Sequence, residues 1–200
     1  MIKIYKESEI SELAHILKND GVISVPTDTV YGVCARINSK KAHANLMAAK
    51  NRPITKLLPI MCADEAQIKS IAIVDERAQK LIRAFMPGPI TLILKKKPEV
   101  PTYVNNGHKT IAIRMATSKA IKELIKKTGS PIFMSSANQS GEKPCSNLNE
   151  IEMSFPNLDG MLEGNVSFNE ASTIVDCTLE EIKILRLGPI SIEDIMSVLR

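Results

Sequence analysis

The sequence predicts an α/β fold: one domain over residues 1–200, built on a twisted, mixed β-sheet that is flanked by helices. Short apolar runs typical of buried strands alternate along the chain with stretches whose apolar residues recur at helical spacing. The composition is 44% hydrophobic and 24% charged, which is ordinary for a globular protein with one core. Near the C-terminus two strand patterns follow each other without a helix between them, so the sheet is not expected to be purely parallel.

In the first part of the chain, capping residues and helix-ending residues predict where the helices begin and end. Ser8, Ser39 and Asp64 are expected N-caps, each followed by apolar residues at helical spacing. The first of these helices should end before Gly21 and the second near Lys50. Strands are predicted in this part at 2–5, 22–25 and 57–62.

The second part of the chain follows the same rules. A helix over 78–85 is stopped by Pro87-Gly88-Pro89, and another is centred on 121–125. A last helix begins at Ser191, with Asp194 in the position of a capping box. Strands are predicted at 90–94, 110–114, 131–134, 172–177 and 182–187.

Charge and cysteine content narrow the protein class. The 26 basic and 22 acidic residues give a net charge of +4, which permits a polyanionic ligand and slightly favours one that carries phosphate. The four cysteines form no C-x-x-C pair and have no histidine at metal-ligand spacing, so no metal site is expected. No apolar run approaches the length of a membrane span, and the N-terminus has no leader pattern. A cytoplasmic protein with reduced thiols and no membrane contact is therefore expected.

The first chemical cluster is P-T-D-T-V-Y-G at 26–32, directly after the apolar strand 22–25. It brings three hydroxyl groups and one carboxylate to the end of a strand, where open α/β sheets bind their ligands. The alternative interpretation is a polar turn in which Asp28 is a turn-forming Asx residue and not a catalytic acid.

The second cluster is K-N-R-P at 50–53. If the chain leaves the helix in an extended conformation, Lys50 and Arg52 point the same way and together neutralise a polyphosphate. The alternative is that these two cations only complement the helix macrodipole.

The third cluster, S-S-A-N-Q-S-G at 135–141, also follows a short apolar strand. Its small residues, hydroxyls and backbone N–H groups suit phosphate or ribose oxygens, and the alternative is a turn rich in local hydrogen bonds. The chain has no G-x-x-x-x-G-K-[ST], no G-x-G-x-x-G and no G-x-S-x-G, so P-loop, Rossmann and serine-hydrolase chemistry are unsupported.

These clusters, with other blocks in the same order, resemble the motifs of the YrdC/TsaC family. The resemblance implies a YrdC-like fold and an enzyme that makes threonylcarbamoyl-AMP and pyrophosphate from L-threonine, bicarbonate and ATP, for threonylcarbamoyladenosine modification of tRNA. Such an enzyme is a nucleotidyltransferase that uses Mg²⁺ with ATP. The further blocks are P-G-P-I-T at 87–91, I-A-I-R at 111–114, S-T-I-V-D at 172–176 and L-R-L-G at 185–188.

The resemblance also implies roles for individual residues. Lys50 and Arg52 are expected to be catalytic through charge neutralisation, and alanine at either position is expected to abolish pyrophosphate release without unfolding the chain. The nucleotide would be held by Lys50, Arg52, Ser136, Asn138 and Arg186. The threonine site would be formed by Thr29, Tyr31, Arg114 and Ser172, with Arg114 facing the carboxylate.

Because the resemblance ends near residue 188, the chain is expected to be the short, single-domain form, which passes its product to separate tRNA-modifying proteins. Two alternatives stay open. One is the carbamoyl-adenylate domain of hydrogenase-maturation carbamoyltransferases, whose additional segments have no counterpart here. The other is a non-catalytic module that binds double-stranded RNA or tRNA, which would show a strongly salt-dependent affinity for RNA and no nucleotide turnover.

Overall fold

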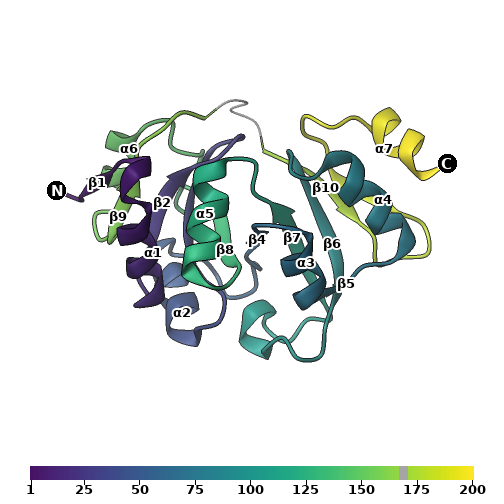
Figure 1. The fold of residues 1–200 in the computed structure, drawn as a ribbon, viewed down its shortest axis with the longest axis horizontal. Coiled ribbons are helices and arrows are strands. Elements are labelled where there is room, and N and C mark those ends of the chain that lie inside the picture. The colour runs from purple at the N-terminus through teal and green to yellow at the C-terminus, as the bar shows by residue number, and fades with distance from the viewer. Residues whose placement is uncertain (167–170) are drawn as a thin grey trace.

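The computed structural model describes residues 1–166 and 171–200, and it confirms a mixed β-sheet flanked by helices (Figure 1). The two termini lie at opposite ends of the long axis (Figure 1). The strands are β1 (Ile4–Tyr5), β2 (Ile23–Pro26), β3 (Tyr31–Arg36), β4 (Ile60–Cys62), β5 (Ala72–Ile73), β6 (Ile90–Lys96), β7 (Thr110–Met115), β8 (Ile132–Ser136), β9 (Gly160–Leu162), β10 (Thr173–Asp176) and β11 (Lys183–Arg186).

These strands form one sheet in the order β1-β9-β2-β3-β8-β4-β7-β6-β10-β11, and β5 pairs with β6 beside this path. Parallel and antiparallel neighbours both occur, since β4 is parallel to β7 and antiparallel to β8. The two C-terminal strands β10 and β11 pair antiparallel, as expected from the missing helix between them. The mixed sheet predicted from the sequence is therefore confirmed.

The helices are α1 (Ile10–Lys18), α2 (Lys40–Ala49), α3 (Glu65–Ile71), α4 (Glu76–Phe85), α5 (Lys119–Thr128), α6 (Leu148–Ser154) and α7 (Ile192–Leu199), with 3-10 turns at Glu7–Glu9 and Thr102–Asn105. Ser39 and Asp64 cap α2 and α3 as predicted, and Ser191 with Asp194 forms the expected capping box of α7. Over the described ranges, every helix is too short or too polar to cross a bilayer.

The predicted cap at Ser8 is wrong. Ser8 lies inside the 3-10 turn that precedes α1, and the backbone N–H of Lys6 donates to the Glu9 carboxylate over 3.0 Å. Glu9 thus satisfies a backbone donor ahead of Ser8, and the first turn begins two residues earlier than the hydroxyl suggested.

Strands β3, β5 and β9 and helix α6 were not predicted. In β3 the residues Tyr31–Ala35 are all buried, so the strand shows no alternation of apolar and polar side chains. Strands β5 and β9 contain only two and three residues, too few for a sequence pattern. Strand β4 also begins at Ile60 and not at Leu57.

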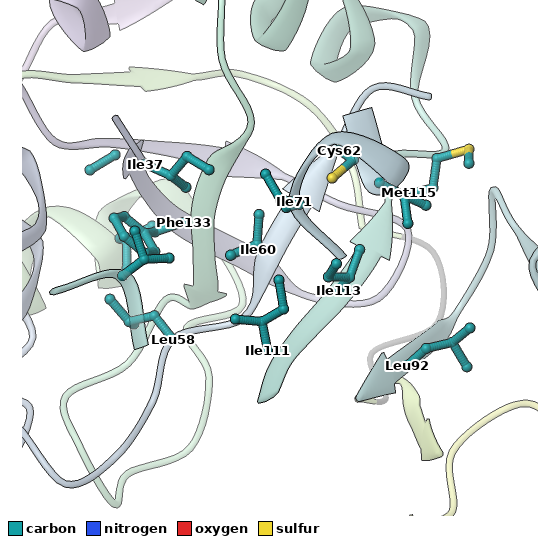
Figure 2. Packing of buried hydrophobic residues seen from close by; sticks show 14 of the residues in the cluster. Ile37, Leu58, Ile60, Cys62, Ile71, Leu92, Ile111, Ile113, Met115 and Phe133 are labelled. Atoms are coloured by element: carbon teal, nitrogen blue, oxygen red, sulfur yellow. The ribbon is translucent and has the colours of Figure 1, made fainter. Parts of the chain in front are cut away.

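Two hydrophobic clusters hold the helices to the sheet. The larger contains side chains of α2, α3 and α4 with Ile60, Ile113 and Phe133, which lie together in Figure 2. The smaller joins α1 and α5 to β2 and includes Leu13 and Leu124. The five residues named from these clusters are at most 1% exposed. Burial of such side chains is the main favourable term in folding.

The strands that cross the middle of the sheet have a second face of different character. Residues that alternate with the core positions Leu92, Ile113 and Val175 point away from the larger cluster. They line a cavity instead, and they are Thr91 and Ile93 of β6, Ala112 and Arg114 of β7, and Ile174 of β10.

Candidate active site

The cavity on this face, here called the sheet pocket, has a volume of about 400 Å³. Most of the residues predicted from the sequence line it: Thr29, Tyr31, Arg52, Arg114, Ser136, Ser172 and Arg186. The two remaining predicted residues, Lys50 and Asn138, are not among its lining residues. Within the described residues the lining contains three arginines and no carboxylate, so the pocket suits an anionic ligand.

The 27–30 turn is fixed by a threonine and not by Asp28. The Thr27 hydroxyl donates to the Val30 carbonyl over 2.6 Å and accepts from the backbone N–H groups of Thr29 and Val30, each over 3.2 Å. The Thr27 and Thr29 hydroxyls are 3.0 Å apart. The interpretation of Asp28 as an Asx residue is therefore wrong, because threonine makes the turn and leaves the carboxylate free for another contact.

That contact is with Arg114. The Asp28 carboxylate accepts from Arg114 Nη2, while Arg114 Nη1 donates to the Thr29 hydroxyl over 2.9 Å and Nε donates to the Gly88 carbonyl over 3.0 Å. The side chains of Arg114 and Asp28 are 9% and 13% exposed. Burial lowers the pKa of Arg114, and the neighbouring Asp28 charge opposes that shift. An arginine has five N–H donors, so two remain for a ligand carboxylate.

The second oxygen of Asp28 is buried and has no partner among the described residues. Tyr31 is fixed too, since its hydroxyl donates to the Gly164 carbonyl, and burial raises the pKa of that hydroxyl. The turn, Arg114 and Tyr31 thus form one preorganised wall of the sheet pocket.

Lys50 lies behind the pocket wall. Its side chain is 1% exposed, and its ammonium donates to the Ser136 carbonyl over 2.5 Å and to the Asn138 carbonyl over 2.7 Å. The expected extended exit is wrong: Asn51 has φ +45°, and the N–H groups of Asn51 and Arg52 bond back to Ala48 and Met47. This is a Schellman end of α2, which separates the directions of Lys50 and Arg52.

Arg52 does reach the sheet pocket. Its Nε donates to the Lys56 carbonyl over 2.9 Å and its Nη2 to the Leu57 carbonyl over 2.7 Å, which holds the guanidinium at the rim. Burial lowers the pKa of Arg52, as burial disfavours any charged group. Three of its five donors remain for a ligand.

The loop after β8 is closed by its own side chains. The Ser136 hydroxyl donates to Asn138 Oδ1 over 2.5 Å, and Asn138 Nδ2 donates to the Gln139 carbonyl over 2.7 Å. Gln139 then ties the loop to α2 and α6 through the carbonyls of Ala49 and Ser154. Both polar atoms of the Asn138 side chain are thus used in hydrogen bonds within the loop. Ser136, in contrast, also lines the sheet pocket.

The opposite wall contains a residue that the sequence analysis did not single out. The Thr91 hydroxyl is 2.8 Å from that of Ser172, and Arg186 donates to the Ser172 hydroxyl over 3.3 Å and to its carbonyl over 3.0 Å. Thr91 is 4% exposed and ends the P-G-P-I-T block. Its place in that block, two residues after Pro89 and near the start of a strand, was the signal available.

Gly188 supports this wall from behind, and its replacement gives a testable result. A Cβ atom at Gly188 would lie 2.2 Å from the Ala171 carbonyl oxygen and 2.7 Å from the Thr173 nitrogen. Gly188→Ala is therefore expected to lower the free energy of unfolding by about 3 kcal/mol, because the contacting backbone must move. Urea denaturation measures this. Gly107→Ala is the control, because the space around Gly107 is open and only its φ of +78° disfavours a side chain. This substitution is expected to lower the free energy of unfolding by about 1 kcal/mol. Equal losses at the two glycines would contradict the steric crowding at Gly188.

Comparisons with known proteins show the family to which the chain belongs. A family model for Sua5/YciO/YrdC, described as telomere recombination, matches residues 15–188, so the chain belongs to this family. A Bacillus subtilis protein named threonylcarbamoyl-AMP synthase is 34% identical over 200 residues, covering 96% of this chain and 57% of the relative. A Yersinia enterocolitica protein of the same name is 29% identical over 80% of this chain and 88% of its own length.

Among solved structures, P. abyssi Sua5 complexed with L-threonine has a TM-score of 0.93 and 29% identity. The match covers 100% of this chain and 61% of the Sua5 chain. The described fold is thus that of the corresponding part of a longer protein crystallised with an amino acid.

Proposed function

We propose that this protein is a threonylcarbamoyl-AMP synthase, a nucleotidyltransferase that forms threonylcarbamoyl-adenylate and pyrophosphate from L-threonine, bicarbonate or CO2, and ATP. The observation that carries the proposal is the sheet pocket, in which Arg52, Arg114 and Arg186 face one cavity together with threonine and serine hydroxyls. Relatives named threonylcarbamoyl-AMP synthase and a related structure with L-threonine support the same conclusion.

The reaction needs charge neutralisation more than acid–base catalysis. The deprotonated amine of threonine forms a C–N bond to CO2, giving a carbamate. A carbamate oxygen then bonds to the α-phosphorus of ATP as the bond to pyrophosphate breaks. Both partners are anions, so fixed cations and alignment lower the barrier. Arg52 and Arg186 are proposed to face the phosphates, with Ser136 and Asn138 in the loop beside them and Lys50 behind that loop.

The threonine end is proposed to lie at the wall formed by the 27–30 turn, Arg114 and Tyr31. Arg114 retains two donors for the substrate carboxylate and is already held by Asp28 and Thr29. Tyr31 lines the pocket on the same wall, and Ser172 lines it from the facing wall. A preorganised arginine of this kind binds a carboxylate without first losing its own conformational freedom.

Mg²⁺ is proposed to enter with ATP. The part of the chain that the structure describes has no group of three His, Cys, Asp or Glu side chains able to hold a metal ion. The pocket hydroxyls and the ATP phosphates fit a Mg²⁺ ion that keeps several waters, since this ion often binds mainly through substrate phosphates. When bound, it would supply further neutralisation of the phosphate charge.

A second candidate function, binding of double-stranded RNA or tRNA without catalysis, has less support. The net charge of +4 permits an RNA contact, but the arginines that line the sheet pocket face a cavity of small-molecule size. A contact with tRNA and transfer of the product to separate modifying proteins are further proposals. Four free, buried cysteines support a reducing, cytoplasmic setting.

The test of the proposed function is the identity of the product. The protein is incubated with ATP, Mg²⁺, L-threonine and ¹³C-bicarbonate, and the mixture is analysed by mass spectrometry. An adenylate that carries both threonine and one ¹³C atom is expected. RNA binding that weakens steeply with salt, with no such adenylate, would favour the binding module instead.

A further inference from the structure

Lys50 is the largest fully buried side chain in the described part of the protein, which is unusual for a lysine. Its ammonium lies where the carbonyls of Ser136 and Asn138 converge, at 2.5 and 2.7 Å. The Phe155 ring centroid lies 5.7 Å from the same nitrogen. A buried cation in such a setting is costly unless its donors are used, and here two of the three ammonium N–H groups are used.

The two carbonyls belong to the loop that follows β8. These bonds run from the end of α2 to a segment 86 and 88 residues away along the chain. The Ser140 N–H returns a third bond to the Lys50 carbonyl over 3.3 Å. Lys50 therefore joins the end of α2 to the loop through hydrogen bonds of its side chain and of its backbone carbonyl.

The protonation state of Lys50 does not alter this arrangement. Burial and the charge of Arg52 lower the pKa of Lys50 to about 7, and Cys145 opposes the shift. A neutral amine still has two N–H groups, which is the number that the two carbonyls require. The contact is thus suited to support, whereas a phosphate contact would need a charged and accessible amine.

We propose that Lys50 is a positioning residue: it fixes the backbone of residues 136–138 so that Ser136 faces the sheet pocket, and it does not itself contact the nucleotide. The statement that this loop holds a nucleotide rests on the proposed function. The attachment of the loop to Lys50 does not, because it consists of hydrogen bonds within the protein itself.

The wild-type protein tests the burial directly. It is treated with an amine-acetylating reagent, with and without ATP and Mg²⁺, and acetylation of each lysine is followed by mass spectrometry. Lys50 is expected to react at least about tenfold more slowly than the exposed Lys56 in both conditions. Fast acetylation of Lys50 that ATP blocks would overturn the proposal in favour of direct contact.

Lys50→Met tests the support of the loop, and Lys56→Met is the matched control because Lys56 reaches the same loop from the surface, at Ser140. In ligand-free Lys50→Met, amide hydrogen exchange at 136–140 is expected to be about tenfold faster or more, with no change in Lys56→Met. Unchanged exchange in Lys50→Met would overturn the proposal. If that variant does not fold, the acetylation result decides.

A kinetic measurement separates positioning from a general loss of structure. In Lys50→Met the KM for ATP is expected to rise about tenfold while the KM for L-threonine stays near that of the wild type. Equal rises in both constants would indicate general damage and overturn the proposal. If the wild type has no turnover at all, the proposed function fails, and hydrogen exchange and acetylation still decide the role of Lys50.

Discussion

Arg114→Met is expected to lower the free energy of unfolding by about 3–5 kcal/mol, because it leaves the Asp28 carboxylate buried without its partner. The pair is well inside the protein, with side chains 9% and 13% exposed, and the second Asp28 oxygen has no partner among the described residues. The remaining carboxylate would have to protonate or draw water into the wall. Urea denaturation of the variant and the wild type measures the loss.

The double variant Asp28→Asn/Arg114→Met is the control. With both charges removed, most of the lost stability is expected to return. Pyrophosphate release is expected to be abolished in the single and the double variant alike, because in neither does a cation face the substrate carboxylate. A single Arg114→Met variant as stable as the wild type would contradict the description of a coupled buried pair. Full activity in the double variant would contradict the assignment of Arg114 to the threonine end.

Arg52→Ala is expected to reduce threonine-dependent pyrophosphate release by about 10²–10³-fold, the usual loss when one preorganised charge-stabilising group is removed. Arg52 is held at the rim by the carbonyls of Lys56 and Leu57 and keeps three donors for phosphate oxygens. Arg52→Lys should restore little of the rate, since lysine cannot reproduce the planar fork. Steady-state rates at saturating ATP and threonine measure the effect.

The folded state of Arg52→Ala is checked by its thermal midpoint, which should fall by only a few degrees because the two lost bonds lie at the rim. Lys56→Ala, a neighbouring cation whose side chain does not line the sheet pocket, should keep wild-type turnover. Near-normal turnover in a well-folded Arg52→Ala protein would remove Arg52 from the nucleotide site.

Local sequence signals predicted local structure well. Ser39, Asp64 and Ser191 were identified as caps because a capping bond joins residues three apart in the chain. The predicted cap at Ser8 was wrong for an equally local reason, since the Glu9 carboxylate accepts from the Lys6 N–H ahead of Ser8. Strand β3 was not predicted because both of its faces are buried, which removes the alternation of apolar and polar residues by which a half-exposed strand is recognised.

Most of the site residues lie in the pocket as predicted, although Lys50 and Asn138 do not line it, and the contacts of the site residues were not predicted. The three clusters and the family resemblance identified Thr29, Arg52 and Ser172 as pocket residues, which they are. That Asp28 pairs with Arg114, and that Lys50 supports the loop after β8, depends on bonds between residues 86 or more apart. No spacing rule reports such contacts, because they form only when the sheet brings distant strands together.

The most direct test of the central claim is pyrophosphate release from ATP with Mg²⁺ and bicarbonate, measured with and without L-threonine. Release that requires both bicarbonate and L-threonine is the result that this account predicts. No release with any amino acid, from a protein that is folded and binds RNA, would contradict it and leave the binding module in its place.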